Sequence, residues 1–318
     1  MAGPCGPSRG QHRALFYEDQ SEFVDDVGAF ALQGLRVGDH VLAAVTPRKR
    51  SWIEGVLGDE AAEVEFLDAD SLYERHGVMF RELLGSLARH STSGGGTLRV
   101  IAEQALEVRQ PAEIRDYLRY EAAANVAYAD HDVSVLCPYD AARLPTKLLE
   151  SALETHPEVL GGGETRRNER FVDPVAFLRR RGEIPAAPAD VARHPIEHPD
   201  DVPVLRAGVA AQARAAGLNR LSVEELTYAV GEVVTNALVH GRAPRRVWSG
   251  VAGDRFVCQV EDSGPGLRDP LAGYLSPDPL RPGGRGLWLA RQLCDLVEIA
   301  SDEAGTSVSL QMRRPAAA

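Results

Sequence analysis

Short apolar runs separated by amphipathic stretches fill the first half of the chain. The runs lie at residues 15–17, 41–45, 64–67, 98–101 and 133–136. Because they are short, apolar and partly β-branched, they are typical of strands buried on both faces of a sheet. Amphipathic segments of helical length separate them, at residues 22–35, 109–127 and 144–156. The alternation predicts an α/β doubly wound N-terminal domain with a parallel sheet covered by helices.

The composition changes after residue 160. Three consecutive glycines at 161–163 precede a charged segment that we interpret as helical through Arg181, and residues 182–203 then contain five prolines. Proline at this density cannot continue a helix or a central strand, so this stretch is predicted to be a linker. We therefore expect a domain at residues 11–160, a helical segment and Pro-rich linker at 161–203, and a second domain at 204–313.

The second domain has a different order of elements. Helices are predicted at residues 204–216 and 223–239, strands at 246–251 and 256–261, a helix at 287–296, and strands at 297–300 and 307–312. This order predicts an α+β sandwich, in which helices cover one face of an antiparallel or mixed sheet. Ser222 and Glu225 have the spacing of a capping box, so we place the start of the second helix at Ser222.

Charge and cysteine content exclude several classes of function. Lys and Arg number 35 against 46 Asp and Glu, which gives a net charge of −11. Such an acidic chain is not expected to bind nucleic acid or an anionic membrane through its overall charge. The four cysteines form no CxxC pair, so neither a zinc ribbon nor a thioredoxin-like site is predicted. Without a signal peptide or an apolar run of about 18 residues, we expect a soluble cytoplasmic protein with reduced thiols.

Glu232 and Asn236 lie four residues apart on the second helix of the C-terminal domain, so they share one side of it. The carboxamide oxygen of Asn236 is a hard ligand of the kind that Mg²⁺ prefers. The carboxylate of Glu232 can polarise an attacking hydroxyl group or water. His240 follows one turn later, and we expect it to pack or cap the helix end rather than catalyse. A Glu–Asn pair alone is usually just a solvated helix face, so its interpretation depends on the rest of the domain.

Asp262 comes at the end of a predicted strand and is followed by Gly264 and Gly266. A carboxylate in this position can accept the amino group of adenine, while glycines allow the backbone to pass close to the ring. Asp and Gly are also favoured in ordinary turns, so this loop alone does not establish a site.

A second glycine-rich loop precedes the third helix of the domain. Gly284 and Gly286 flank Arg285, and backbone N–H groups at a helix N-terminus together with a guanidinium group can bind a phosphate. The loop differs from a Walker A motif because it lacks the Gly-Lys-Ser/Thr ending. Thr306 opens the last strand after Gly305, which is also compatible with a simple hairpin turn.

Taken in order, these features resemble the ATP-binding domain shared by gyrase, Hsp90, histidine kinases and MutL. The resemblance covers about residues 202–312. It implies that Asn236 holds Mg²⁺, that Asp262 binds adenine with Thr306 in support, and that residues 267–282 form a lid over the phosphates. The ATP-binding residues that it implies are Asn236, Asp262, Gly264, Gly266, Gly284, Arg285, Gly286, Leu287 and Thr306.

Within this superfamily, the domain is similar to bacterial anti-sigma factors that are serine/threonine protein kinases. The similarity is carried by the spacing of Glu232 and Asn236 and by the sequence GRGLW at 284–288. It implies that Glu232 is the catalytic base that activates a serine hydroxyl of an antagonist protein. An autophosphorylating histidine kinase is disfavoured, because His194 and His198 each precede a proline and are thereby pushed out of helical conformation.

The expected function is therefore an ATP- and Mg²⁺-binding regulatory kinase that acts in transcription regulation and is controlled by the N-terminal domain. The alternative is a non-catalytic switch that binds nucleotide or a partner and sequesters a sigma factor or other regulator. A slow ATP hydrolase is a third option. The expected partners are a sigma factor or an anti-sigma antagonist, with a homodimer left open and with neither nucleic acid nor a membrane.

Residues 11–160 resemble the MEDS sensory domain. The resemblance rests on the sequence LFYE at 15–18, on Gly34 and Asp39 with their neighbours, on CPYD at 137–140, and on His156 before Pro157. It implies that the domain senses a small, hydrocarbon-derived ligand. Cys137 and Asp140 follow a predicted strand, where doubly wound folds place ligands. Each also has an ordinary interpretation, as a small buried residue and as a turn residue, and we assign no ligand site here.

Overall fold

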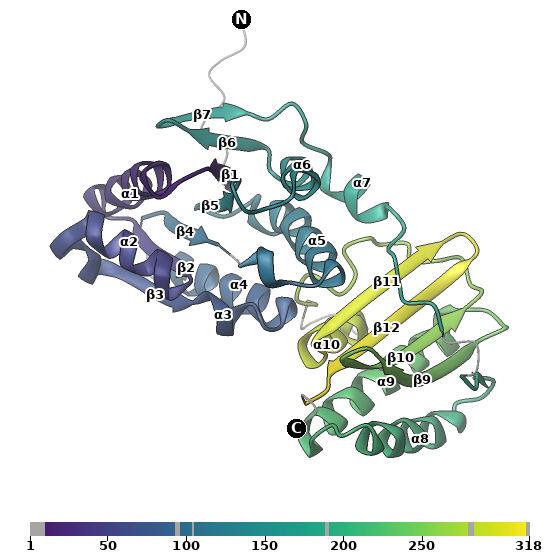
Figure 1. Ribbon diagram of the computed structural model, residues 1–318. Helices are drawn as coiled ribbons and strands as arrows, with labels where there is room; N and C mark the ends of the chain where they lie inside the picture. The colour runs from purple at the N-terminus through teal and green to yellow at the C-terminus, as the bar shows by residue number, and fades with distance from the viewer. Residues whose placement is uncertain (1–9, 93–95, 104, 188–190, 279–282, 316–318) are drawn as a thin grey trace, which may run out of the picture. The chain divides into compact units, whose positions relative to one another are not determined.

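The computed structural model describes residues 10–92, 96–103, 105–187, 191–278 and 283–315. The chain divides into two compact units, one built mainly from residues 1–177 and the other mainly from residues 178–318 (Figure 1). Each unit has a sheet and a hydrophobic core of its own.

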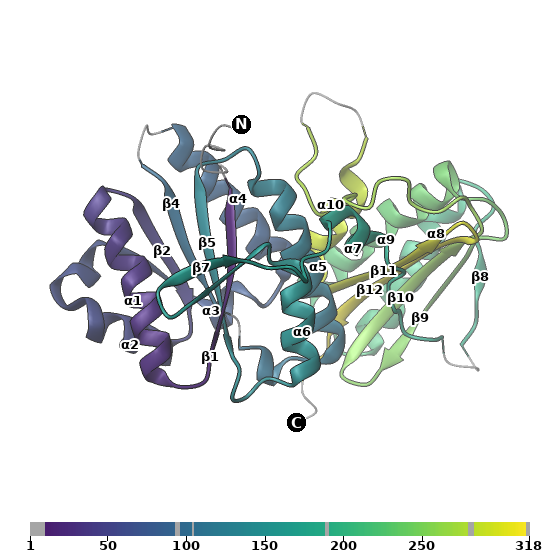
Figure 2. The ribbon, with the colours of Figure 1, turned by 90° about the horizontal axis from the view of Figure 1, so that it is seen from above.

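The described part of the first unit contains a seven-stranded sheet with the order β3-β2-β4-β5-β1-β6-β7. The strands are β1 (Gln11–Tyr17), β2 (His40–Val45), β3 (Val64–Asp68), β4 (Leu98–Ala102), β5 (Val133–Asp140), β6 (Glu158–Gly161) and β7 (Glu164–Arg167). Neighbouring strands from β3 to β6 are parallel, and β7 runs antiparallel to β6. Figure 2 shows β2, β4, β5 and β1 side by side in this order.

Helices cover both faces of this sheet. The helices of this part of the chain are α1 (Gln20–Val37), α2 (Pro47–Leu57), α3 (Ala69–Leu72), α4 (His76–Thr92), α5 (Pro111–Tyr128) and α6 (Thr146–Thr155), with the 3-10 turns η1 (Gly58–Glu63) and η2 (Leu106–Val108). Helix α7 (Pro174–Arg179) follows where the first unit ends. Apolar residues of α1 and α2 form one core with β1, β2 and β4. Residues of α4 and α5 line a cavity against β1, β4 and β5. The predicted doubly wound α/β architecture is confirmed.

Local signals explain where the helices of this unit begin and end. Asp19 caps α1 by accepting a hydrogen bond from the backbone N–H of Glu22, and Gly38 ends the helix with a φ of 82°, which favours glycine. Helix α5 begins with Pro111, whose missing N–H costs nothing in the first turn. These boundaries agree with the helices predicted at residues 22–35 and 109–127.

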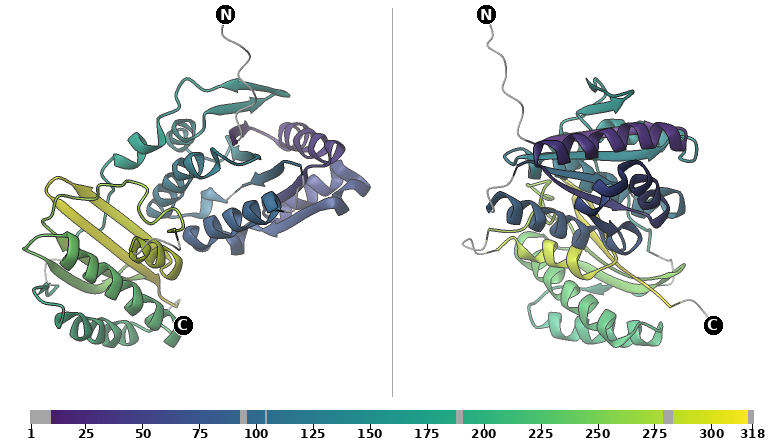
Figure 3. Two further views of the ribbon diagram at one scale, coloured as in Figure 1. Left: turned by 180° about the vertical axis from the view of Figure 1, so that it is seen from behind. Right: turned by 90° about the vertical axis from the view of Figure 1, so that its left-hand side faces the viewer.

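The second unit contains a five-stranded antiparallel sheet with the order β11-β12-β10-β9-β8. Its elements are β8 (His194–Pro195), α8 (Asp201–Ala215), α9 (Arg220–His240), β9 (Arg246–Ala252), β10 (Arg255–Asp262), α10 (Arg285–Leu293), β11 (Leu296–Asp302) and β12 (Gly305–Arg313). Figures 1 and 3 show the three helices on one face of the sheet. The predicted α+β sandwich is confirmed.

The core of the second unit lies between α9 and the sheet. Leu226, Val230 and Val233 are buried along one side of α9 and belong to the same hydrophobic cluster as Phe256 and Cys258 of β10. The spacing of three and four residues places the apolar side chains of α9 on one side. Its polar residues Glu232 and Asn236 are consequently kept out of this core.

Two local predictions from the sequence are wrong. The capping residue of α9 is Asn219, whose side chain accepts a hydrogen bond of 2.9 Å from the backbone N–H of Ser222. Ser222 therefore lies inside the first turn instead of preceding it. Residues 164–167 of the stretch interpreted as helical form β7, because Gly162 and Gly163 have φ values of 60° and 77° and reverse the chain into a hairpin.

The Pro-rich linker contributes to the second unit. His194 and Pro195 pair with β9 as an edge strand, a position that tolerates proline because one side of the strand needs no hydrogen bonds. The next residue, Ile196, is 1% exposed and belongs to the core of the second unit. Across the described stretches of the chain, none of the helices combines the length and the hydropathy that a membrane crossing requires.

Candidate functional site

Glu232 and Asn236 project from the half-buried side of α9 and face the start of α10. A methyl group added at Gly286 would lie 2.9 Å from Nδ2 of Asn236 and 3.1 Å from Oε2 of Glu232. Both separations are shorter than normal contacts to a side-chain carbon, so any larger residue here would push the ends of the Asn236 and Glu232 side chains aside. The structure thus brings the predicted phosphate loop to the predicted base and the predicted metal ligand, which lie about 50 residues earlier in the sequence.

The N-terminus of α10 has the conformation that its glycines make available. Gly283 and Gly284 have φ values of 90° and 74°, and Gly284 is the residue before the first turn. Glycine has no side chain with which to cap the helix, so the N–H groups of the first turn suit an anion. Arg285 is exposed beside them, whereas the side chain of Leu287 is 9% exposed and belongs to the core, where it anchors α10.

Asp262 lies at the carboxyl end of β10 and is half-buried. Its Oδ1 accepts a hydrogen bond of 2.7 Å from the backbone N–H of Gly264. Burial raises the pKa of this carboxyl group, while hydrogen bonds from the backbone of Gly264 and Arg242 and the charge of Arg245 oppose the rise. The carboxylate is therefore placed in a partly desolvated setting, where a hydrogen bond to a ligand gains strength.

The end of α9 is close to this carboxylate. A methyl group added at Gly241 would lie 2.5 Å from Cγ of Asp262, so glycine is required there as well. Arg245 donates to the carbonyl oxygens of Ala237 and Gly241, at 2.8 and 3.0 Å, and thereby caps the helix. His240 is exposed, and the capping that we considered for it is supplied by Arg245, which the sequence did not indicate.

Thr306 stands opposite Asp262 in the β10–β12 pairing. Its hydroxyl group lies 3.0 Å from that of Ser301, and the Ser301 hydroxyl accepts a hydrogen bond of 2.7 Å from the backbone N–H of Leu267. Gly266, with a φ of 75°, would place a methyl group 2.3 Å from the carbonyl oxygen of Asp302. Ser301 therefore ties the predicted lid to the sheet, and sequence patterning offered no signal for this role.

The loop predicted as a lid is described from Leu267 to Asp278, and its residues 279–282 lie outside the described residues. Gly273, with a φ of 85°, would place a methyl group 2.8 Å from Cβ of Leu287. The guanidinium group of Arg291 lies 4.0 Å from the ring centre of Tyr274. The first part of the loop therefore packs on α10, close to the glycine-rich turn.

The first unit has a buried charged group at the carboxyl ends of its strands. Oε1 of Glu103, which follows β4, accepts a hydrogen bond of 2.5 Å from the hydroxyl group of Tyr17 and lies 3.4 Å from Nζ of Lys49. Burial raises the pKa of Glu103 to about 7, although Lys49 and Tyr17 oppose the rise. The ammonium group of Lys49 also lies 4.4 Å from the ring centre of Trp52. Asp140 is the last residue of β5, and its Oδ2 lies 3.6 Å from Nε of Arg143.

Comparisons with known families match both units. Residues 11–157 match the MEDS family, described as the methanogen/methylotroph, DcmR sensory domain. Residues 197–312 match the histidine kinase-like ATPase domain. These matches confirm the two resemblances expected from the sequence. Among curated proteins, none matches the chain significantly.

Solved structures give the following similarities. The RsbU and RsbW domains of Rv1364c from Mycobacterium tuberculosis are 23% identical, with 41% of this chain and 34% of that chain covered and a TM-score of 0.30. The histidine kinase domain of a blue-light-activated kinase from Erythrobacter litoralis is 17% identical, with coverages of 44% and 74% and a TM-score of 0.25. The kinase domain of the E. coli osmosensor EnvZ is 20% identical, with coverages of 42% and 94% and a TM-score of 0.25. The match thus spans 34% of the length of the first of these chains.

Proposed function

Since the chain joins a MEDS sensory domain to a histidine kinase-like ATPase domain, we propose that it is an ATP- and Mg²⁺-dependent protein kinase of the anti-sigma type. It transfers a phosphoryl group to a serine or threonine of an antagonist protein, and the sensory domain controls this transfer. The partners of such a kinase are a sigma factor and its antagonist.

The observation that carries this proposal is the contact of Gly286 with Glu232 and Asn236. It combines a helix N-terminus suited to phosphates, a carboxamide suited to a hard cation and a carboxylate suited to accept a proton. Phosphoryl transfer depends mainly on the positioning of such groups and on their charges.

The residues present fit a magnesium nucleotide. The side chain of Asn236 is half-buried beside Gly286, and its carboxamide oxygen is a donor of the kind that Mg²⁺ prefers. Asn236 would hold Mg²⁺, which neutralises charge on the phosphates when it is bound. The first turn of α10 and Arg285 would bind the phosphate oxygens, and Asp262 would accept the amino group of adenine beside Thr306.

Glu232 acts on the acceptor hydroxyl group. Its carboxylate accepts the proton of the serine or threonine as the hydroxyl oxygen forms its bond to the γ-phosphorus and the bond to the β–γ bridging oxygen breaks. The products are the phosphorylated antagonist and ADP. This role predicts that loss of Glu232 removes transfer but spares nucleotide binding.

Calorimetry with Mg²⁺ and a non-hydrolysable ATP analogue, together with phosphotransfer from labelled ATP to candidate antagonists, tests the proposal. Glu232→Gln should bind the analogue within about threefold of wild type and lose at least about 10²-fold in transfer. Asp262→Asn should no longer bind the ATP analogue. Glu224→Gln, on the exposed side of the same helix, should change neither.

Three outcomes would contradict the kinase assignment. Nucleotide binding by the wild-type chain without any phosphorylated partner would favour a sequestering switch. Phosphate release that requires no acceptor protein would favour a slow hydrolase. Absence of adenine nucleotide binding in the wild-type chain would overturn the kinase, the hydrolase and a switch that depends on nucleotide.

A further inference from the structure

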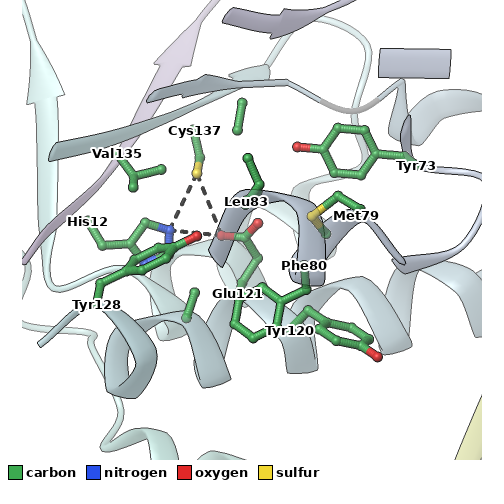
Figure 4. Close-up of a pocket in the computed structure, with 12 residues that line it drawn as sticks. His12, Tyr73, Met79, Phe80, Leu83, Tyr120, Glu121, Tyr128, Val135 and Cys137 are labelled. Atoms are coloured by element: carbon green, nitrogen blue, oxygen red, sulfur yellow. Dashed lines mark hydrogen bonds and ion pairs between the residues drawn. The ribbon is translucent and has the colours of Figure 1, made fainter. Parts of the chain in front are cut away.

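Four buried side chains of the first unit point toward a common centre. They are His12 on β1, Glu121 on α5, Cys137 on β5 and His156, which follows α6, and their potential ligand atoms all lie within 4.8 Å of one another. Figure 4 shows three of them, His12, Glu121 and Cys137, directed toward each other. All four are less than 10% exposed. Buried imidazole, thiolate and carboxylate groups in one cluster form a donor set that is typical of metal sites.

The spacing of the donors suits a four-coordinate ion. Oε2 of Glu121 lies 3.0 Å from Nε2 of His12 and 3.1 Å from Nε2 of His156. Sγ of Cys137 lies 3.4 Å from Nε2 of His12 and 3.6 Å from Oε2 of Glu121. A tetrahedral zinc site with bonds of about 2.0–2.3 Å has donor–donor distances of roughly 3.3–3.8 Å. Small outward shifts of the side chains would therefore admit an ion at the centre.

The outer nitrogen of each histidine is held by an oxygen acceptor. Nδ1 of His156 lies 2.8 Å from the carbonyl oxygen of Ala152, and Nδ1 of His12 lies 3.2 Å from Oδ1 of Asn125. The amide group of Asn125 is oriented by donation to the carbonyl oxygen of Thr155 at 2.8 Å, which leaves its oxygen toward His12. An acceptor at Nδ1 selects the tautomer with the proton there, so the lone pair of Nε2 faces the centre. This arrangement orients the histidines of many metal sites.

The contacts inside the cluster do not satisfy its buried nitrogen. Nε2 of His156 has no hydrogen-bond partner among the described residues, although Oε2 of Glu121 is 3.1 Å away. The two groups are thus close without being aligned on each other. A divalent cation would satisfy this nitrogen and would also balance the two negative charges of the Glu121 carboxylate and the Cys137 thiolate. A neutral assembly is the form in which these groups are least costly to bury.

A small cavity adjoins the cluster. Its volume of about 20 Å³ is enough for one water molecule. Besides His12, Glu121 and Cys137, it is lined mainly by aromatic and aliphatic side chains, including Tyr73, Met79, Phe80, Tyr120 and Tyr128 (Figure 4). The donors are thus shielded from bulk solvent on an apolar side, while one water-sized molecule can sit next to them.

We propose that His12, Glu121, Cys137 and His156 bind one divalent transition-metal ion, and that this ion is Zn²⁺. Mixed imidazole, thiolate and carboxylate donors in four-coordinate geometry favour zinc over Mg²⁺ and Ca²⁺, which prefer oxygen donors, and over Fe–S clusters, which prefer thiolates. The site is separate from the Mg²⁺ ligand assigned to Asn236 and does not depend on the kinase proposal.

Elemental analysis and Zn²⁺ titration of the full chain, purified without a histidine tag, test this site. The wild-type chain should bind one equivalent, and Cys137→Ser and His156→Gln should each lower the affinity at least about 10²-fold. Two controls should leave the affinity unchanged: Cys258→Ser, which alters a buried cysteine of the second unit, and His40→Gln, which alters an exposed histidine of the first.

Spectroscopy with Co²⁺ keeps the test decisive if a ligand variant folds poorly. The wild-type complex should show a thiolate-to-cobalt charge-transfer band, which Cys258→Ser keeps and Cys137→Ser loses. Asn125→Ala, which leaves all four ligands in place, should weaken binding about 10–100-fold. A wild-type chain that binds no metal, or binding that survives Cys137→Ser, would overturn the site. One equivalent of a different metal would overturn the assignment to zinc.

Discussion

Gly286 is the residue at which the start of α10 meets the polar side of α9, and its substitution tests that contact. The added methyl group of Gly286→Ala would lie 2.9 Å from Nδ2 of Asn236 and 3.1 Å from Oε2 of Glu232. Both side chains must then move by a few tenths of an ångström. We expect the affinity for a magnesium nucleotide to fall at least about tenfold, which corresponds to 1.4 kcal/mol, while the fold is kept.

The matched control for this variant is Gly208→Ala on α8, where an added methyl group meets open space. That change should leave nucleotide affinity unaltered and should stabilise the helix by about 0.5–1 kcal/mol. Calorimetry and thermal unfolding measure the two effects separately. Equal affinities for Gly286→Ala and wild type would show that α10 lies farther from the ligand than we propose.

Glu103 makes the stability of the first unit depend on pH. Its pKa in the folded chain is about 7, against roughly 4.3 when unfolded, so the native state holds the proton more tightly. The stabilisation from this group is therefore complete below about pH 4.3 and is lost as the pH rises through 7. In Glu103→Gln, whose side chain stays neutral, the free energy of unfolding relative to wild type should rise between pH 5 and pH 8.

Urea unfolding at intervals across this pH range measures the difference. Glu82→Gln, an exposed substitution on α4, serves as the control and should follow the wild-type curve. Parallel curves for Glu103→Gln and wild type would mean that the carboxyl group is already ionised at pH 5 in the folded chain.

How much of the site could be predicted depended on where its residues lie in the sequence. Glu232 and Asn236 share a helix, and helical periodicity alone places them on one side of it. His12 and His156 are far apart in the chain and meet only because the sheet order puts β1 beside β5 and β6. For Cys137 the sequence indicated only a position after a predicted strand, where doubly wound folds place ligands, or a small buried residue. Without a CxxC pair or a local histidine motif, nothing connected it with His12, Glu121 and His156.

At the level of elements, the start of α9 gives a direct test of a corrected prediction. The side chain of Asn219 accepts from the N–H of Ser222, so Asn219→Ala should lower the free energy of unfolding of the second unit by about 1 kcal/mol. Ser222→Ala should change it by less than about 0.5 kcal/mol, because Ser222 already lies within the helix. Denaturant titration of both variants distinguishes the two capping schemes. A larger loss of unfolding free energy in Ser222→Ala than in Asn219→Ala would show that Ser222 caps the helix, as the sequence predicted.

The elements themselves could be predicted best where hydrophobic periodicity is strong. The five buried strands of the first sheet and the three main helices of the second unit are confirmed. The hairpin of β6 and β7 was missed because the exposed residues of β7, Glu-Thr-Arg-Arg, show no alternation of apolar and polar positions. Strand β8 was missed for a related reason: two residues at a sheet edge carry too little pattern to outweigh a proline.

On the scale of the whole molecule, the two hydrophobic cores predict separate responses to ligands. In scanning calorimetry, a magnesium nucleotide analogue should raise the melting temperature of the second unit, and Zn²⁺ should raise the melting temperature of the first unit. Each ligand at 100 times its Kd should add about 2.7 kcal/mol to the unit that binds it. Asp262→Asn should abolish only the nucleotide effect, and Cys137→Ser only the zinc effect. A single transition that both ligands shift equally would contradict this independence.

The hairpin that closes the first sheet has a consequence for behaviour in solution. An open parallel sheet ends in a row of unpaired backbone groups, onto which the strand of another molecule can be added. Here the last strand on one side, β7, is only four residues long, and all four are exposed, with one acidic and two basic side chains. A strand of another molecule that paired with β7 would have to accommodate these charged side chains. It would also gain few backbone hydrogen bonds, because β7 is so short. This border of the protein is thus poorly suited to seeding aggregates.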